Sequence, residues 1–394
     1  MYDLLIKNAR IYPMEHDASV ARAHTLAVSN GRIAALGVPE HTAAREIFDA
    51  ANRVLLPGFV DCHTHALYAG NRLAEHTLKL RGTSYAEIAR AGGGIQTTVR
   101  AVRAADEAQL VQESLPRLEA LAAEGVTTVE IKSGYGLDSL HELKMLRAIH
   151  QLRARLDMDV VATFLGAHAV PVGRSREDYF QDVINVMLPA VAKGKLAESV
   201  DIFAETIAFT TDEVRELFVT ATKAGLQCRI HSDQLSHMGA TEAAATLGAL
   251  SCDHLEYADE DDVLAMARAG SVAVLLPGAF YFLRETRKPP VELLRRHQVP
   301  IAVATDLNPG SSPIASLLTV MHMAALLFGL TPDEILLGVT RHAAKALGRE
   351  QQVGSLVPGR HADFTVWDIP APEFLLYQLG GLKPAAIFFK GKRT

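Results

Sequence analysis

The chain has 394 residues, of which 49% are hydrophobic and 21% charged, an ordinary composition for a globular protein with room for more than one domain. Its net charge of -6 argues against a nucleic-acid partner, and no apolar run approaches the roughly 18 residues that span a bilayer. The start of the chain lacks signal-peptide features, and its three cysteines lie in apolar strand-like segments, as free thiols of a reducing compartment do. We therefore expect a cytoplasmic protein without nucleic-acid or membrane partners.

Short strands and turns alternate through the first 56 residues. Strands are expected at residues 4–6, 25–28 and 33–36, and Asn30-Gly31 between the last two is a typical hairpin turn. The other end of the sequence has a similar pattern, with strands expected at residues 362–367 and 385–389. We predict that residues 1–56 and 350–394 form one small composite β-sandwich domain.

Residues 57–349 alternate between β and α patterns. Eight apolar runs rich in β-branched residues end near one residue each: His65, Lys132, His168, Glu205, His231, His254, Pro277 and Asp306. Helix starts lie between them, and after the start at Asp138 an apolar face is expected at Leu140, Leu143, Leu146 and Ile149. Eight β/α units in about 290 residues predict a catalytic (β/α)8 TIM barrel of the α/β class. The competing fold is a doubly wound open sheet, which no GxGxxG turn supports.

In a TIM barrel the active site lies at the carboxyl ends of the strands, and here several strands end on residues able to bind metal. His63 and His65 lie two apart on the first strand, so both imidazoles are expected to point into the barrel mouth. A His-x-His pair alone is weak evidence, because two ordinary histidines would look the same. Together with His231 and Asp306 it makes three imidazoles and one carboxylate, which predicts a site for a divalent metal.

Such a metal lowers the pKa of a bound water towards about 7 and so generates hydroxide at neutral pH. The reaction also needs a proton acceptor and a proton donor. His254 and Asp306, one beside the metal and one ligating it, are the candidates for this transfer. Each of these residues alone would more often be a packed, hydrogen-bonded core residue, so the prediction depends on their joint pattern.

The block from Leu56 to His65, LPGFVDCHTH, resembles the first-strand signature of the amidohydrolase superfamily. Further blocks resemble the imidazolonepropionase family within it, and the resemblance covers essentially the whole chain: residues 92–95, 131–136, 164–168, 275–281 and 304–310. The resemblance implies metal-dependent hydrolysis of the cyclic amide of 4-imidazolone-5-propanoate to N-formimidoyl-L-glutamate, a step of histidine degradation. It also implies a homodimer, since the superfamily tends to dimerise.

The same resemblance assigns roles to individual residues. It implies one zinc or iron ion held by His63, His65, His231 and Asp306, with His254 as the proton-transfer histidine. Contacts to a small substrate with a carboxylate tail are implied for Arg72, Tyr135, His168, Gln234, Asn308, Gly310 and Ser311. An arginine fork suits a propionate, although Arg72 alone would read as a surface residue. Some relatives carry Glu where this chain has Gln234, and a neutral amide cannot serve as a base.

Several alternatives stay open. Glu205 ends the fourth strand, where other superfamily members bridge a second metal, and Lys132 is expected to support the site or the barrel. The pocket could also hold a neutral ring, as in another cyclic-amide hydrolase or aminohydrolase of the superfamily. A non-catalytic barrel is disfavoured, because every expected ligand position is present. The remaining histidines off the strand ends are expected to be ordinary surface or helix residues: His76, His141, His150, His237, His322 and His342.

Overall fold

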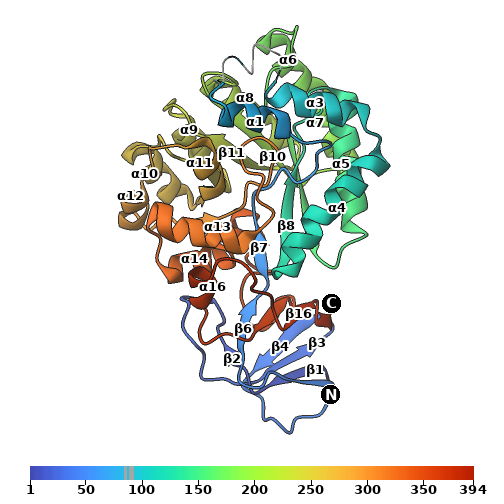
Figure 1. Ribbon diagram of the computed structural model, residues 1–394, viewed down its shortest axis with the longest axis vertical. Coiled ribbons are helices and arrows are strands. Elements are labelled where there is room, and N and C mark those ends of the chain that lie inside the picture. The colour runs from blue at the N-terminus through green and yellow to red at the C-terminus, as the bar shows by residue number, and fades with distance from the viewer. Residues whose placement is uncertain (84–86, 88–92) are drawn as a thin grey trace.

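A computed structural model describes residues 1–83, 87 and 93–394 of the chain. A barrel of strands surrounded by helices forms the larger part, and a smaller β-rich part containing both ends of the chain lies against one end of it (Figure 1). Gly92, which opens one of the family-like blocks, lies outside the described residues.

The larger part contains, among the described residues, one sheet of eight strands joined by parallel pairs in sequence order. These strands are β7 (Phe59–Asp61), β8 (Val126–Lys132), β9 (Asp159–Ala167), β10 (Ser199–Ala204), β11 (Gln227–Ser232), β12 (Ser251–His254), β13 (Val272–Leu275) and β14 (Ile301–Val303). The first and last strands meet just beyond their carboxyl ends, where the amide of Asp306 donates to His63 O and the amide of His65 donates to Leu307 O, both at 3.0 Å. The predicted (β/α)8 barrel is therefore confirmed, and an open sheet is excluded.

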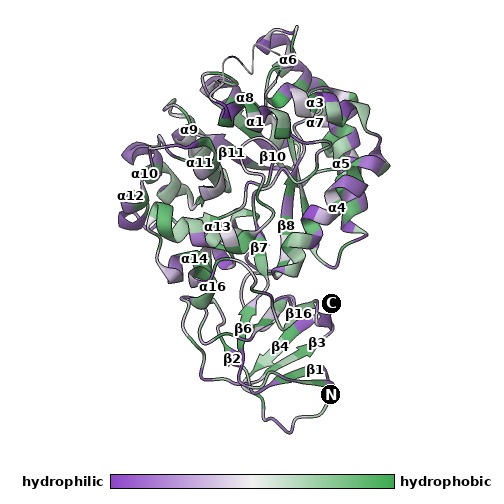
Figure 2. Ribbon diagram, viewed as in Figure 1, coloured by the Kyte–Doolittle hydropathy of each residue, from purple (hydrophilic) through white to green (hydrophobic). Residues whose placement is uncertain are grey.

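Helices and helical turns cover the outside of this sheet. They are α1 (Leu73–Leu80), α3 (Ile95–Ala104), α4 (Glu107–Ala123), α5 (Ser139–Arg153), α6 (Arg176–Asp182), η1 (Val183–Met187), α7 (Leu188–Gly194), α8 (Thr211–Lys223), α9 (Ala240–Thr246), α10 (Glu260–Ala269), α11 (Pro277–Leu283), α12 (Val291–Arg296), α13 (Leu317–Met323), η2 (Ala324–Phe328), α14 (Pro332–Gly338), α15 (Arg341–Ala346) and α16 (Phe374–Tyr377). Hydrophobic residues concentrate in the strands and on the inner helix faces (Figure 2). Their burial is the main force that holds the helices on the sheet.

Two further sheets build the smaller part. One has the order β4-β3-β1-β5, from β1 (Tyr2–Lys7), β3 (Leu26–Ser29), β4 (Arg32–Leu36) and β5 (Ala44–Asp49). The other has the order β17-β16-β15-β6-β2, from β2 (Arg10–Ile11), β6 (Val54–Pro57), β15 (Phe364–Trp367), β16 (Ala386–Phe389) and β17 (Lys392–Arg393). The second sheet joins segments far apart in sequence, since β15 pairs antiparallel with β6. The division of the chain into the two predicted domains stays a prediction.

The predicted hairpin joins β3 and β4. Asn30 and Gly31 both have positive φ, +52° and +71°, which is the conformation of a tight two-residue turn. Gly58 alone separates β6 from β7, and a Cβ there would lie 2.1 Å from Thr127 Oγ1. The small sheet therefore runs directly into the first barrel strand through a position that only glycine fits.

Two expectations about local structure are wrong. β7 ends at Asp61, so His63 and His65 lie beyond the strand, in a segment aligned by its backbone bonds to residues 306 and 307. Leu140 is 68% exposed, so it does not lie on the buried face of α5. The buried side of α5 begins instead at Glu142 and continues through Leu146 and Ile149.

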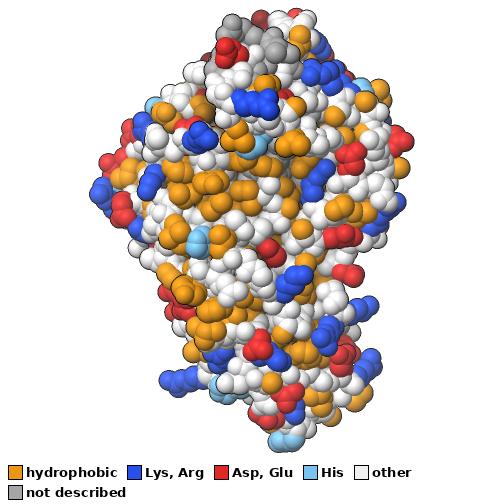
Figure 3. Space-filling view, in the orientation of Figure 1, with side chains coloured by type: hydrophobic (Ala, Val, Ile, Leu, Met, Phe, Trp, Pro, Cys, Tyr) orange, Lys and Arg blue, Asp and Glu red, His pale blue; other side chains and the backbone are white. Residues whose placement is uncertain are grey.

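The surface is mixed in character. On the face shown in Figure 3, hydrophobic side chains gather over α11 and α13, and charged side chains are scattered around them. No helix in the described ranges is both long and apolar enough to cross a membrane. All three cysteines are free and buried, as expected.

Candidate active site

Three imidazoles and one carboxylate meet at the carboxyl end of the barrel. His63 and His65 follow β7, His231 lies in β11, and Asp306 follows β14. His65 Nε2 lies 3.3 Å from His231 Nε2, and Asp306 Oδ1 lies 3.5 Å from Nε2 of both His63 and His65. Residues from three elements, up to 243 positions apart in the sequence (306 minus 63), thus converge on one point.

The donor atoms of this cluster fit a metal ion. One ligand atom from each histidine lies within 4.8 Å of the others. His63 Nε2 is buried without a hydrogen-bond partner, and a buried orphan nitrogen is costly unless something binds it. Imidazole nitrogens with one carboxylate are the donor set that zinc and iron favour. The cluster could therefore hold a divalent ion through these four residues.

Carboxylates behind the cluster fix how two of the rings are oriented. His63 Nδ1 lies 2.6 Å from Asp253 Oδ2, and His231 Nδ1 lies 3.1 Å from Asp201 Oδ1. A hydrogen bond at Nδ1 leaves the lone pair on Nε2, facing the centre of the cluster. Both rings are therefore held in the form that can bind a metal.

Burial sets the charge of the cluster. It lowers the pKa of His63 and of His65 well below the ordinary value. Lys132 adds to the effect at His63, and His168 adds to it at His65, so both rings are neutral at neutral pH. Burial also raises the pKa of Asp306 well above its usual range. A carboxylate in this position needs a nearby cation to stay ionised, and a divalent ion would provide it.

Lys132 belongs to a fully buried charge network inside the barrel. Its Nζ lies 2.8 Å from both Glu130 Oε1 and Asp201 Oδ2, and Arg229 contacts Glu130 and Asp253. Burial and Arg229 lower the pKa of Lys132, but the surrounding carboxylates outweigh them and raise it. Lys132 stays charged and neutralises the carboxylates that orient the metal-site histidines, which matches its expected supporting role.

Glu205 is bound by the loop after β11. Its carboxylate accepts hydrogen bonds from the amide of Leu235 at 2.7 Å, the amide of Ser236 at 3.2 Å and the hydroxyl of Ser236. These bonds engage both of its oxygens, which disfavours a second metal at Glu205 and makes it the anchor of the loop after β11. That loop carries Gln234.

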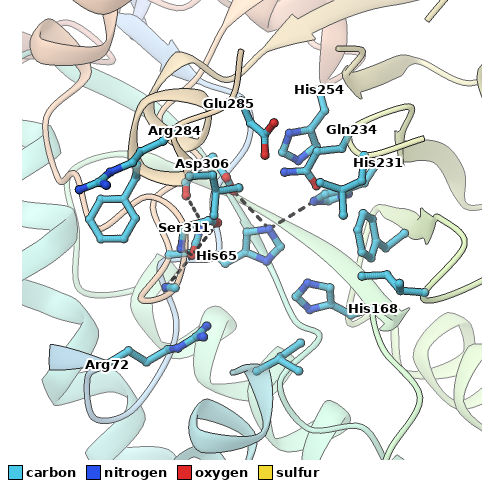
Figure 4. A pocket seen from close by; sticks show the side chains of 18 of the residues that line it. His65, Arg72, His168, His231, Gln234, His254, Arg284, Glu285, Asp306 and Ser311 are labelled. Carbon is cyan, nitrogen blue, oxygen red and sulfur yellow. Dashed lines mark hydrogen bonds and ion pairs between the residues drawn. The ribbon is translucent and has the colours of Figure 1, made fainter. Parts of the chain in front are cut away.

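A cavity of about 520 Å³ opens beside the cluster (Figure 4). It is lined by all the residues for which substrate or proton-transfer roles are predicted: Arg72, Tyr135, His168, Gln234, His254, Asp306, Asn308, Gly310 and Ser311. His63 lies beneath the cavity floor, fully buried. The structure therefore brings the predicted set together around one space.

Arg72 and the loop after Asp306 form one wall. Glu75 holds Nε and Nη2 of Arg72 at 2.9 and 2.8 Å, which leaves Nη1 against the backbone of Gly310. Asn308 Oδ1 accepts the amides of Gly310 and Ser311 at 2.8 and 2.7 Å and so shapes the loop. This wall presents the guanidinium of Arg72 and the hydroxyl of Ser311, which suit a carboxylate.

Tyr135 and His168 form a second wall. The carboxylate of Glu142 accepts three backbone amides, from Gly134, Gly136 and Leu137, and so fixes the loop that carries Tyr135. His168 Nδ1 lies 2.9 Å from Gly134 O, and its ring stacks on His65 at a centroid distance of 5.1 Å. This side of the cavity is built from rings in fixed orientations.

His254 stands beside the cluster in an unusual backbone conformation. Its φ of +83° and the +74° of Leu255 are rare for side chains of this size and mark a strained turn. The ring centroid lies 5.4 Å from that of His231. Burial lowers the pKa of His254 well below the ordinary value, so its ring is neutral and can accept a proton.

Sequence reasoning missed part of the cavity. His76 was expected to be an ordinary helix residue, but it lines the cavity and stacks on Phe282 at 5.0 Å. Lys79, Arg284 and Glu285 also line it. The missed residues lie in or next to helices α1 and α11, where nothing in the local sequence distinguishes a cavity wall from an exposed surface.

Comparison with known proteins decides the family. A family model described as the amidohydrolase family matches residues 54–394. A curated relative from Hahella chejuensis, named imidazolonepropionase, is 50% identical and covers 98% of each chain. A protein of the same name from a Bradyrhizobium species is 51% identical and covers 96% of each chain. The chain belongs to the imidazolonepropionase family of amidohydrolases.

Solved structures share the fold of this amidohydrolase at much lower identity. A 5-methylcytosine deaminase from Klebsiella pneumoniae has a TM-score of 0.75 at 19% identity, covering 99% of this chain and 96% of its own. An adenosine deaminase from Xanthomonas campestris has a TM-score of 0.70 at 17% identity, covering 100% and 92%. These likenesses concern the barrel and its accompanying sheets.

Proposed function

We propose that this chain hydrolyses the cyclic amide of 4-imidazolone-5-propanoate to N-formimidoyl-L-glutamate. The observation that carries this proposal is a single cavity in which Arg72 faces the cluster of His65, His231 and Asp306 (Figure 4). A ring with an anionic tail fits such a cavity, because the tail can reach the guanidinium while the ring carbonyl lies at the cluster. Relatives at about 50% identity over nearly the whole chain carry the name of this activity.

Each group of residues around the cavity has its own role in the proposed reaction. Arg72, Asn308 and Ser311 bind the propionate, and Tyr135 and His168 pack against the ring. His63, His65, His231 and Asp306 would hold one zinc or iron ion, which would polarise the ring carbonyl and make a water molecule more acidic. His254, neutral through burial, accepts a proton from the attacking water and returns it to the leaving ring nitrogen.

Asp306 has a second role in this scheme. Its Oδ1 lies 3.5 Å from Nε2 of two imidazoles of the cluster, and its second oxygen receives a proton during the attack. Gln234 takes no proton, because its amide is neutral. It binds the ring by hydrogen bonding.

The test is incubation of metal-replete protein with freshly generated imidazolone propionate. Loss of the ultraviolet absorbance of the substrate and formation of formimidoylglutamate by mass spectrometry are expected. Absence of turnover with both zinc and iron would overturn the proposal and favour a different ring as substrate. Arg72→Met should raise KM at least tenfold, since a charge-assisted pair is worth about 1.5–3 kcal/mol. An unchanged KM would remove the assignment of Arg72 to the tail.

We further propose that the chain is a cytoplasmic homodimer. The dimer follows the habit of the superfamily, and the three free, buried cysteines are consistent with a reducing compartment. Sedimentation equilibrium of the purified protein tests whether it is a dimer. A mass equal to one chain at micromolar concentration would contradict it.

A further inference from the structure

Glu285 places a carboxylate in the cavity that the roles above do not use. It follows α11, which begins at Pro277 just after β13. Arg284 ends this helix in a left-handed conformation, with φ of +59°, and the amide of Glu285 donates to Phe280 O at 3.0 Å. This turn sends the two side chains apart: Arg284 points outward, and Glu285 points towards His254 and Gln234 (Figure 4).

The carboxylate of Glu285 is not bound by any residue that the structure describes. Within the ranges that the structure describes, it makes no hydrogen bond or ion pair, whereas Glu75, Glu142 and Glu205 are each bound by donors. Glu256 lies close enough to Glu285 to feel its charge: burial raises the pKa of Glu256 to about 8, and Glu285 contributes to the rise. This end of the cavity therefore carries a carboxylate that no described cation neutralises.

The opposite end of the cavity carries the opposite charge. Arg72 lies across the cavity from Glu285, with the cluster around His65 and Asp306 between them (Figure 4). A ligand with an anionic group at one end and a cationic or N–H-bearing group at the other would satisfy both walls. The cavity is therefore polarised along one direction.

The proposed reaction, on which this inference rests, creates such a ligand. The water oxygen forms a bond to the ring carbonyl carbon, and the bond from that carbon to the ring nitrogen breaks. Both protons of the water end on the N–C–N group, one on the released nitrogen and one that completes the amidinium. The neutral ring and water thus become a carboxylate and a protonated formimidoyl group, so one negative and one positive charge appear together. A planar amidinium presents two N–H groups side by side, as a guanidinium does, and suits a carboxylate.

We propose that Glu285 binds the N–C–N portion of the substrate and stabilises the amidinium cation that forms as the ring opens. The propionate then lies at Arg72, the ring carbonyl at the metal-site residues, and the leaving nitrogen between His254 and Glu285. A carboxylate that faces this charge as it develops stabilises the transition state of ring opening and so lowers its barrier. Glu285 also gives the site its preference for a ring that becomes cationic on hydrolysis.

Two inhibitors that differ in one charge test this role. N-formimidoylglutamate carries the amidinium, and N-formylglutamate has a neutral formyl oxygen in its place. Wild-type protein should bind the first more tightly. Glu285→Gln should weaken binding of the first by about 10- to 100-fold, and kcat/KM by a similar factor, but change binding of the second less than about twofold. Glu285→Asp keeps the charge and should retain most of the preference.

Controls separate this role from a structural one. Glu216→Gln, an exposed change in α8 away from the cavity, should leave both inhibition constants unchanged. If Glu285→Gln keeps the wild-type preference, or weakens both inhibitors equally, the proposal is overturned. If Glu285→Gln does not fold, loss of the preference in Glu285→Asp overturns it. Failure of the proposed function looks different, because wild-type protein would then neither hydrolyse imidazolone propionate nor bind formimidoylglutamate.

Discussion

The guanidinium of Arg72 lies against the backbone of Gly310, where a Cβ atom would stand 2.1 Å from Nη1. Such a contact is impossible for any side-chain-bearing residue unless the arginine moves. The far end of an arginine can move at little cost to stability. Glycine is therefore needed at position 310 to let Arg72 keep its place, and not to let the chain fold.

Gly310→Ala should therefore impair binding more than folding. We expect KM for imidazolone propionate to rise about tenfold, because the guanidinium loses its place at the propionate, with kcat less affected. The melting temperature should change by less than about 2 °C. Steady-state kinetics and calorimetry give both values. In the double variant with Arg72→Met the two effects should not add, and additive effects would show that the residues act independently.

At this scale the sequence predicted which residues come together in the candidate site but not what holds them in place. His63, His65, His231 and Asp306 were selected because each follows an apolar run, and they cluster although His63 and His65 lie beyond their strand. Glu285 follows a helix, and its importance arises only from the turn at Arg284. Contacts of this kind depend on the path of the backbone, which residue type does not reveal.

Two loops of the active site are held by the same device, a buried carboxylate that accepts backbone amides. Glu142 holds the loop of Tyr135, and Glu205 holds the loop of Gln234. Charge-assisted bonds to amides are about twice as strong as neutral ones, so both loops are fixed before substrate arrives.

Glu205→Gln should loosen the second loop without removing metal. The amide side chain accepts through one oxygen only, so the backbone amides of Leu235 and Ser236 should exchange with solvent at least tenfold faster, as hydrogen-exchange mass spectrometry can measure. KM should rise through displacement of Gln234. The ratio of metal to protein should stay the same. A fall in that ratio would instead support a second metal ion at Glu205.

His342 couples α15 to the barrel and makes stability depend on pH. Its Nδ1 lies 3.0 Å from Ile301 O in β14, and burial lowers its pKa to about 4. In the unfolded chain the pKa of a histidine is near 6.5. Between these two values His342 is therefore protonated in the unfolded state and neutral in the folded state. The contribution of His342 to the free energy of unfolding is therefore complete above about pH 6.5, and roughly 3 kcal/mol of stability is lost as the pH falls to about 4.

The variant His342→Asn keeps a donor for Ile301 O but does not titrate. Its free energy of unfolding, from urea titrations between pH 4 and 7, should fall less steeply with acidification than that of the wild type. The two curves should differ by up to roughly 3 kcal/mol over this range. Parallel curves would show that the acid sensitivity arises at other groups.

Element patterns were predicted well where one face is buried and poorly at element ends. The number of barrel strands and the Asn30-Gly31 hairpin follow from apolar runs and turn residues. Leu140 was expected to be buried because it fits the helical period, yet the first turn of α5 buries Glu142 instead. The three amides that satisfy this carboxylate belong to a loop whose path the helical period does not encode.

At the scale of the molecule, a bound ion would link strands β7, β11 and β14 across the barrel. An ion that binds only the folded chain stabilises it by mass action, by about 2.7 kcal/mol at a hundredfold excess over Kd. Chelation should therefore abolish activity and lower the melting temperature by about 5 °C or more, and stoichiometric zinc or iron should restore both. His231→Ala should show no shift on metal addition. An equal shift in that variant would place the stabilising ion elsewhere.

The pairing of β6 with β15 has a consequence for biosynthesis. β6 continues through Gly58 into β7, which leads to His63, yet its antiparallel partner is Phe364–Trp367, made some 300 residues later. At translation rates of about 5–20 residues per second, this strand waits at least about 15 seconds with an open edge on the nascent chain. The barrel strands can pair in the order in which they emerge from the ribosome, but the sheet that anchors the first of them is completed only when the last has left it.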